Sequence, residues 1–184
     1  MSTAAATTTA YDELVSLSRE AALLGGTAGL LGWDQEVHMP RGGIAYRGRQ
    51  LAQLARMRHE LVTSERMAEL LAACADDASL TADPESPVAV NIRELKRDHE
   101  RAVRLPASLV EEEATLASEG QHTWAEARSA DDFSRFRPVL ERIVDLLRRK
   151  AECYGWAEGG EPWDALAEDY EPGCTAAGVA EVFT

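Results

Sequence analysis

The sequence has little of what builds cross-linked or membrane-spanning proteins. Its three cysteines, Cys74, Cys153 and Cys174, are widely spaced and form no C-x-x-C pair. They therefore indicate neither a disulfide framework nor a cysteine metal site, and they suit a reducing compartment. The most apolar stretch, from Leu23 to Trp33, contains four glycines and is too short to span a bilayer. A secreted disulfide-rich domain and a transmembrane helix are both excluded.

Positive charge is also scarce. Lysine and arginine number 19 against 32 aspartates and glutamates, which gives a formal net charge of −13 and an isoelectric point near 4.7. Such a field repels phosphate backbones and anionic lipids, so we expect neither nucleic acid nor a membrane surface as a partner. Residues 1–10 lack the basic start and apolar core of a signal peptide. We predict a disordered tail over 1–10 and a cytoplasmic protein.

What the chain has in quantity is alanine, with 31 residues, while aromatic residues make up only 6%. Abundant alanine and few β-branched residues favour helices over sheets. Apolar residues follow helical spacing, and glycine and proline punctuate them. The sequence therefore predicts an all-α fold of mostly antiparallel helices within one region, 11–184. The expected helices cover 11–31, 44–61, 63 or 64 to 73, 87–104, 106–128, 131 or 132 toward 159, and a short 163–168, with a loop over 76–87.

Two helices carry further expectations. The sixth places apolar residues at alternating spacings of three and four, which predicts a buried seam of Phe133, Phe136, Leu140, Ile143 and Leu147. Near the end, Thr175 is a good N-cap for another apolar helix that includes Val179, Val182 and Phe183. The sequence stops at Thr184 without a C-cap signal. We expect from this that the sequence ends inside a larger fold, with a frayed terminal helix as the alternative.

Histidine–glutamate pairs occur twice, but neither completes a zinc-peptidase motif. Such a motif needs a second histidine four residues after the first. His59-Glu60 has Thr63 at that position, and His99-Glu100 has Val103. Glu119-x-x-His122 has the spacing of half a di-iron ligand set, and no second half exists. We therefore expect structural histidines, no catalytic residue and no metal ligand in this chain.

An unusual polar segment precedes the break at Pro40: Trp33, Asp34, Gln35, Glu36, Val37, His38 and Met39. At a spacing of two on a helix, its two acids would point to different faces and could not act as one pair. One interpretation has Trp33 anchoring the core and Asp34 pairing with Arg47 or Arg49. The other has the segment lining a cleft, with Trp33, Asp34, Gln35, Glu36 and Met39 as candidate cleft residues.

Four arginines follow one another along the predicted helix over 87–104: Arg93, Arg97, Arg101 and Arg104. They could bind an acidic partner. Acidic residues alternate with them, however, and favourable pairs at helical spacing balance their charge. We predict a solvated, self-compensating helix face.

The chain nevertheless resembles the carboxypeptidase Taq family of zinc metallocarboxypeptidases, also called the thermostable carboxypeptidase 1 type. The resemblance rests first on 30–43, Leu-Leu-Gly-Trp-Asp-Gln-Glu-Val-His-Met-Pro-Arg-Gly-Gly, and on Trp163-Asp164-Ala165-Leu166 with Tyr170-Glu171-Pro172-Gly173. Intermediate segments match in order, among them Leu105-Pro106, Gln121-His122-x-Trp124 and Asp132-Phe133-x-x-Phe136. It covers nearly all of the chain after Ala10.

The resemblance implies an all-helical, cytosolic, homodimeric enzyme that uses zinc to remove C-terminal residues from peptides. The family's H-E-x-x-H helix lies beyond everything matched here, so we expect the zinc-binding part to be absent and no zinc to be bound by this chain. Two functions stay open. The chain is either the N-terminal groove wall of such an enzyme, not catalytic alone, or a stand-alone helical module for protein interaction or assembly.

Overall fold

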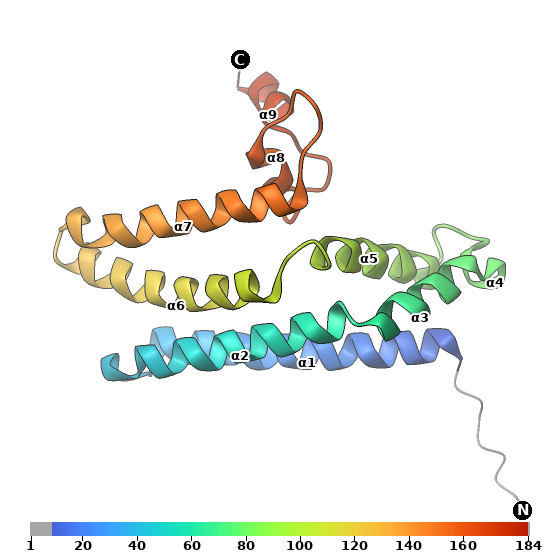
Figure 1. The fold of residues 1–184 in the computed structure, drawn as a ribbon, viewed down its shortest axis with the longest axis horizontal. Helices are drawn as coiled ribbons and strands as arrows, with labels where there is room; N and C mark the ends of the chain where they lie inside the picture. The colour runs from blue at the N-terminus through green and yellow to red at the C-terminus, as the bar shows by residue number, and fades with distance from the viewer. Residues whose placement is uncertain (1–8, 184) are drawn as a thin grey trace, which may run out of the picture.

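The fold is all-helical, as predicted (Figure 1). The computed structural model describes residues 9–183, and these form nine α-helices and one 3-10 helix, with no strand among them. No helix in this range is long and apolar enough to cross a membrane. The elements are α1 (Ala10–Val37), η1 (Arg41–Gly43), α2 (Ile44–Val62), α3 (Glu65–Asp76), α4 (Ala78–Thr81), α5 (Pro87–Ala102), α6 (Ala107–Ser129), α7 (Phe133–Tyr154), α8 (Pro162–Ala167) and α9 (Ala176–Val182).

Two long antiparallel hairpins dominate the arrangement. The turn containing η1 joins α1 to α2, and a short turn joins α6 to α7. Helix α2 lies along α6, so the two hairpins pack side by side. Helices α3, α4 and α5 extend this body at one end, while α8 and α9 lie beyond α7, on the side away from α1 (Figure 1).

Side-chain caps explain where several helices begin. Ser64 Oγ accepts a hydrogen bond from the Met67 amide at 3.2 Å, and Ser86 caps α5 in the same way ahead of Pro87. The sequence leaves two candidate N-caps for α3, Thr63 and Ser64, and the structure uses Ser64. It uses Asp132 for α7, because Asp131 has a φ of 50° and lies outside the helix.

Some predicted boundaries need correction. Helix α1 continues six residues past Leu31 to Val37, which puts most of the polar segment on the helix itself. The predicted loop over 76–87 contains the short α4, whose N-cap Asp77 accepts a hydrogen bond from the Ser79 amide. Thr9 and Asp12 form a capping box, so the helical part begins inside the predicted tail. Residues 1–8 of that tail lie outside the described residues.

Apolar side chains are buried in three clusters rather than one. The first joins α1, α3 and α5: Leu14, Met67, Leu70, Leu71, Cys74 and Ile92. The second lies between α6 and α7: Leu109, Leu116, Val139 and Leu146. The third joins α7 to α8: Ala151, Tyr154 and Ala165. Each cluster fastens one helix pair or triplet, which suits an extended rather than a globular helical body.

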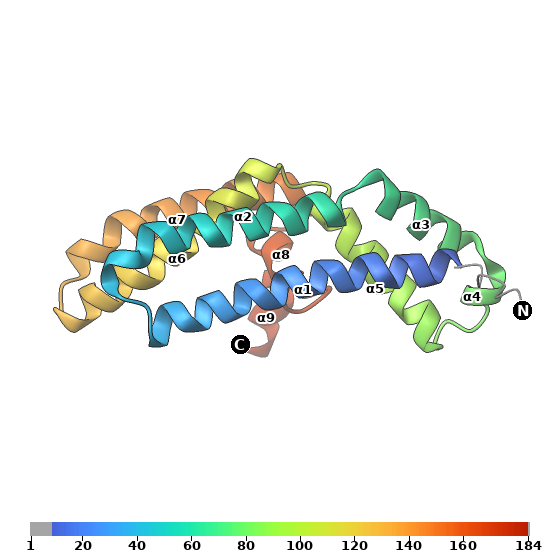
Figure 2. The ribbon, with the colours of Figure 1, turned by 90° about the horizontal axis from the view of Figure 1, so that it is seen from below.

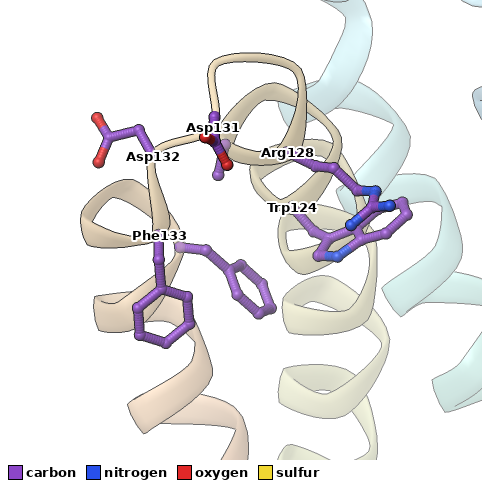
Figure 3. Close-up of a pocket in the computed structure, with 7 residues that line it drawn as sticks. Trp124, Arg128, Asp131, Asp132 and Phe133 are labelled. Atoms are coloured by element: carbon purple, nitrogen blue, oxygen red, sulfur yellow. The ribbon is translucent and has the colours of Figure 1, made fainter.

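The predicted seam of α7 is wrong at its first position. Phe133 is 63% exposed, and the other predicted seam residues, Phe136, Leu140, Ile143 and Leu147, are half-buried. The buried residues of the helix are Val139, Leu146, Ala151 and Tyr154. The first turn of α7 follows directly on the connection after Ser129, and an open hollow separates it from the last turns of α6. Phe133 therefore borders an open hollow of about 580 Å³ (Figure 3). Trp124 and Arg128 of α6 line the hollow, and the Asp132 side chain points away from it.

Candidate functional site

The polar segment, residues 33–39, forms the end of α1, and its side chains point in three different directions. Trp33 projects outward and is 54% exposed, so its predicted role as a core anchor is wrong. Its ring meets His38 edge-on, with centroids 5.2 Å apart and planes at 75°. The amides of His38 and Met39 both donate to the Asp34 carbonyl, which closes the helix at this point. The indole is therefore presented at the surface, in contact with the His38 ring.

Asp34 points instead toward α2. Its Oδ2 accepts a hydrogen bond from Arg47 Nη2 at 2.5 Å, and the Arg47 side chain is buried. The same guanidinium donates to the Leu31 carbonyl and, through Nε, to Gln50 Oε1 at 3.2 Å. The predicted pairing of Asp34 with an arginine of the next helix is confirmed, with Arg47 rather than Arg49 as the partner. This contact fixes the end of α1 against α2.

Gln35 points toward α6. Ser118 Oγ donates to Gln35 Oε1 at 2.6 Å, and Gln35 Nε2 donates to the Ser118 carbonyl at 3.3 Å. Ser118 is buried, and Gly48 of α2 lies close enough that a Cβ there would meet Ser118 Oγ at 3.9 Å. The end of α1 is thus tied to both α2 and α6, which gives the rest of the segment a fixed frame.

Glu36 and Met39 border a polar cavity of about 250 Å³ between the end of α1 and α6. Gln35, Arg41, Gln121, His122 and Ala125 complete its lining. Of the candidate cleft residues, Gln35, Glu36 and Met39 line this cavity, whereas Trp33 and Asp34 do not. That the segment lines a substrate cleft stays a prediction. As predicted from their spacing, the two acids do not act as a pair.

Beside this cavity, His122 and Arg41 share one carboxylate. His122 Nε2 lies 3.7 Å and Arg41 Nη1 3.6 Å from Glu126 Oε1. Glu119, the other member of the candidate metal pair, is bound to Arg142 of α7 at 2.7 Å. The side chains of Glu119 and His122 therefore do not converge on a common point. The cavity offers polar contacts for a ligand, but its lining contains no pair of a nucleophile and a general base.

Residues 9–183 contain no set of side chains that could bind the zinc implied by the resemblance. Across residues 9–183, no three histidine, cysteine, aspartate or glutamate side chains converge in a way that could hold a metal ion. His99 Nδ1 is instead hydrogen-bonded to the Val62 carbonyl at 2.8 Å. Burial lowers the pKa of His59, against a hydrogen bond to the Leu105 backbone that raises it. Both histidines join α2 to the α5 region, as the structural interpretation predicts.

A second polar cluster, which is not among the sequence predictions, joins α5 to the segment after α8. Arg97 and Arg101, expected on a solvated face, reach across to Glu168 and Asp169 at 3.2 and 2.6 Å. The Arg101 guanidinium also stacks 3.9 Å above the buried Tyr154 ring. Two of the four arginines therefore bind a segment about 70 residues away.

The prediction of a self-compensating face on α5 holds only in part. Arg93 pairs with Glu94 of its own helix at 3.2 Å, and Arg97 lies 3.8 Å from the same side chain. Arg104, just past the helix, donates instead to the Tyr154 carbonyl of α7 at 2.6 Å. The prediction is right for Arg93, incomplete for Arg97 and wrong for Arg101, whose acidic partner is Asp169.

Lys150 completes this cluster, which borders a cavity of about 400 Å³. Its Nζ donates to Glu113 Oε1 at 2.8 Å and lies 3.9 Å from Asp169. Burial alone would lower the pKa of Lys150, but the Glu113 and Asp169 carboxylates outweigh it and raise the value. Lys150 and Tyr154 lie one helical turn apart, and that spacing is the only sequence signal for the cluster. The cluster holds the Tyr-Glu-Pro-Gly turn, residues 170–173, against α5 and α7.

The contacts of Glu168 with the Gly173 amide and with Arg97 should depend on pH in a testable way. Its carboxylate accepts the Gly173 amide at 2.7 Å and pairs with Arg97, and these contacts lower its pKa below the usual 4.5. A lowered folded-state pKa means that the contact is intact above the unfolded value and is lost as pH falls through the folded one. We expect the Gly173 amide NMR resonance to titrate below pH 4.5, and the titration to disappear in Glu168→Gln. An apparent pKa at or above the ordinary glutamate value would contradict this.

With the geometry described, comparison with known proteins assigns the family. The model of the carboxypeptidase Taq (M32) metallopeptidase family matches residues 13–184. This chain belongs to the M32 family. It is 38% identical to thermostable carboxypeptidase 1 of Thermus thermophilus over 181 residues, covering 95% of this chain and 35% of that protein. It is 33% identical to thermostable carboxypeptidase 1 of Pyrococcus furiosus, covering 87% of this chain and 31% of that protein.

Solved structures of the M32 family agree. The structure titled "BsuCP Crystal Structure" has a TM-score of 0.85 at 26% identity, covering 95% of this chain and 34% of that chain. Trypanosoma cruzi metallocarboxypeptidase 1 has a TM-score of 0.71 at 28% identity, covering 96% and 35%. The M32 chain described here therefore spans about a third of the length of its relatives and folds as their corresponding part.

Proposed function

We propose that this chain forms the N-terminal third of a metallocarboxypeptidase that removes C-terminal residues from peptides. The observation that carries the proposal is the similarity over 95% of the chain to an M32 structure about three times as long. The metal ligands then come from the remaining two thirds of the fold, because residues 9–183 assemble no ligand set. The metal supplies an electrophile and an activated water for peptide hydrolysis.

Within that enzyme, we assign the cavity at the end of α1 to the wall of the peptide groove. Glu36, Met39, Gln121 and His122 offer one charged, one apolar and two polar contacts at its edge. Arg47 and Ser118 hold the end of α1 in place, so these groups are positioned before a peptide arrives. Their role is to bind and orient peptide, with no proton transfer assigned to them.

The remaining parts of the proposal follow the family resemblance. We assign zinc as the metal, a homodimer as the assembly and the cytoplasm as the location. The net charge of −13 supports a protein without a nucleic-acid partner. Metal analysis and sedimentation of the full-length enzyme are the direct measurements.

The activity is tested with a chimera. Residues 1–184 replace the matching third of the Thermus thermophilus enzyme, and the product is assayed on a peptide with a free C-terminus and on the same peptide amidated. We expect release of the terminal residue from the free peptide only, its loss with chelator and its return with zinc. The 184-residue chain alone should release nothing under the same conditions. A chimera that folds and binds zinc but hydrolyses neither peptide would overturn the proposal, as would zinc-dependent release by the purified short chain.

The groove assignment has its own variants. In the chimera, we expect Met39→Ala and Glu36→Gln to raise KM several-fold with a smaller change in kcat, because they remove binding contacts remote from the metal. Glu94→Gln, on the exposed face of α5, is the matched control and should leave both constants unchanged. Unchanged KM in both groove variants would remove this cavity from the peptide path.

The alternative is a stand-alone helical module for protein interaction or assembly. Its support is that the described helices bury three apolar clusters of their own. The intact mass of the protein in the cells that make it separates the two functions. A species much heavier than 20.1 kDa favours the enzyme, and one of 20.1 kDa favours the module.

A further inference from the structure

Helix α1 carries a second apolar face that nothing in the described chain covers. The outer stripe, as we name it, consists of Leu23, Gly26, Leu30, Trp33 and Val37, at alternating spacings of three and four. All five are exposed, from 54% for Trp33 to 71% for Leu23 among the large side chains. Such spacing produces one continuous seam along a helix and is the pattern by which helices pair. From its first residue to its last, the stripe extends about 21 Å at about 1.5 Å per residue.

The stripe is also uncharged and open to close approach. Residues 21–33 contain no ionisable side chain, and the Asp34 carboxylate is turned to Arg47. A Cβ at Gly26 or Gly29 would meet nothing within 4 Å, so another backbone can come near there. Beside the stripe, Leu24, Met57 and Leu61 extend the apolar surface into a groove of about 660 Å³. Figure 2 shows α1 crossing in front of α5 and α8.

The stripe is too regular to be incidental exposure. Scattered apolar residues are normal at protein surfaces, whereas a continuous apolar patch marks a contact surface. On the same helix, Leu14 and Ala21 are already buried on the opposite, inner side, so the outer stripe is not needed to hold α1 in this body. What it contacts must come from outside residues 9–183. The M32 relatives supply such material, because this chain covers only 34–35% of their length.

We propose that the outer stripe seats an α-helix from the remaining two thirds of the M32 fold. This inference rests on the proposed function, since that function supplies the further polypeptide. The partner helix presents its own apolar seam to Leu23, Leu30 and Val37 and passes close to α1 at Gly26, where no side chain intervenes. Glu20 and Glu60 rim the neighbouring groove, so basic residues flank the partner's seam.

The test uses cysteine alkylation in the Thermus chimera, with Cys74, Cys153 and Cys174 replaced by alanine. Leu30→Cys probes the stripe. Tyr46→Cys is the matched control, because Leu30 and Tyr46 are both 62% exposed in the present chain. Arg49, which stacks over the Tyr46 ring, lines a hollow shared with α6 and α7, so this control lies away from the stripe. Rates are compared with those of the same protein unfolded in urea.

We expect the thiol of the Leu30→Cys variant to react at least tenfold more slowly in the folded chimera than in urea. The thiol of the Tyr46→Cys variant should react within a few-fold of its urea rate. A Leu30→Cys thiol that reacts within twofold of its urea rate in a folded chimera overturns the inference. Should the chimera not fold, the full-length Thermus enzyme carrying only residues 10–62 of this chain, which include both Leu30 and Tyr46, takes its place, with the same two outcomes.

Failure of this inference and failure of the proposed function give different results. An active chimera with a freely reactive thiol in the Leu30→Cys variant keeps the enzyme and removes the docking surface. A folded, inactive chimera in which that thiol is protected keeps the docking surface and removes the activity. The yield of folded chimera is a further readout. We expect Leu30→Lys to lower it at least tenfold, whereas Tyr46→Lys should leave it within twofold of the parent chimera.

Discussion

Replacing Arg47 with methionine is expected to lower the free energy of unfolding by about 2–3 kcal/mol. Removing one partner of a buried ion pair costs about 3–5 kcal/mol, because the other charge is left unpaired. The Asp34 side chain is 37% exposed, so water partly solvates the carboxylate that remains, and the expected cost is smaller. Even so, this would be among the largest single effects available at the candidate site.

The cost comes from three hydrogen bonds that one side chain makes. Arg47 donates to Asp34 and to the Leu31 carbonyl of α1, and to Gln50 within its own helix. Methionine resembles the arginine stem in its unbranched shape and its helix propensity, so packing and helix formation change little. The destabilisation therefore reports on the polar interactions between α1 and α2, and the substitution should loosen the segment that lines the candidate groove.

Arg49→Met is the matched control on the same helix. Arg49 is exposed and its guanidinium lies 5.6 Å from the centre of the Tyr46 ring. Its replacement should therefore cost less than about 0.5 kcal/mol. Urea denaturation followed by circular dichroism measures both variants against the parent chain. Equal costs for the two substitutions would mean that the buried pair does not hold the hairpin together.

Local signals in the sequence predict most of the helices and their start sites. Ser64, Ser86 and Asp132 act where a short polar side chain precedes an apolar run, and capping depends only on such near neighbours. The exact end of α1 is not predictable in this way. It extends to Val37 because Arg47 and Ser118 hold its last turns from two other helices.

Interactions between distant segments account for the remaining errors. The local pattern balances Arg101 by acids on its own helix, yet Arg101 pairs with Asp169, 68 residues away. Large aromatic side chains are usually well buried, yet the described chain leaves Trp33 54% exposed. For the candidate site, the sequence locates the segment and identifies the Asp34 pairing. Which side chains line the cavity depends on how α1 meets α6, and no local pattern encodes that.

Leu14→Ala is expected to destabilise the chain by about 2–5 kcal/mol, the largest effect we predict for one substitution. Leu14 has no exposed surface and packs among Met67, Leu70 and Cys74, so the substitution leaves a cavity where α1, α3 and α5 meet. Rigid surroundings relax only partly around such a hole, so the missing dispersion attraction adds to the transfer free energy of the removed methyl groups.

Leu23→Ala makes the same chemical change further along the same helix, on a side chain that is 71% exposed. In the 184-residue chain it should cost less than about 0.5 kcal/mol, because this side chain buries little apolar area there. Denaturant titration of both variants measures this difference, and comparable costs would contradict the burial of Leu14. If the outer stripe seats a further helix, the same Leu23→Ala substitution should cost more than about 1 kcal/mol in the chimera. Leu23 then belongs to a core that only the longer polypeptide completes, and its energetic role differs between the two proteins although its local sequence is the same.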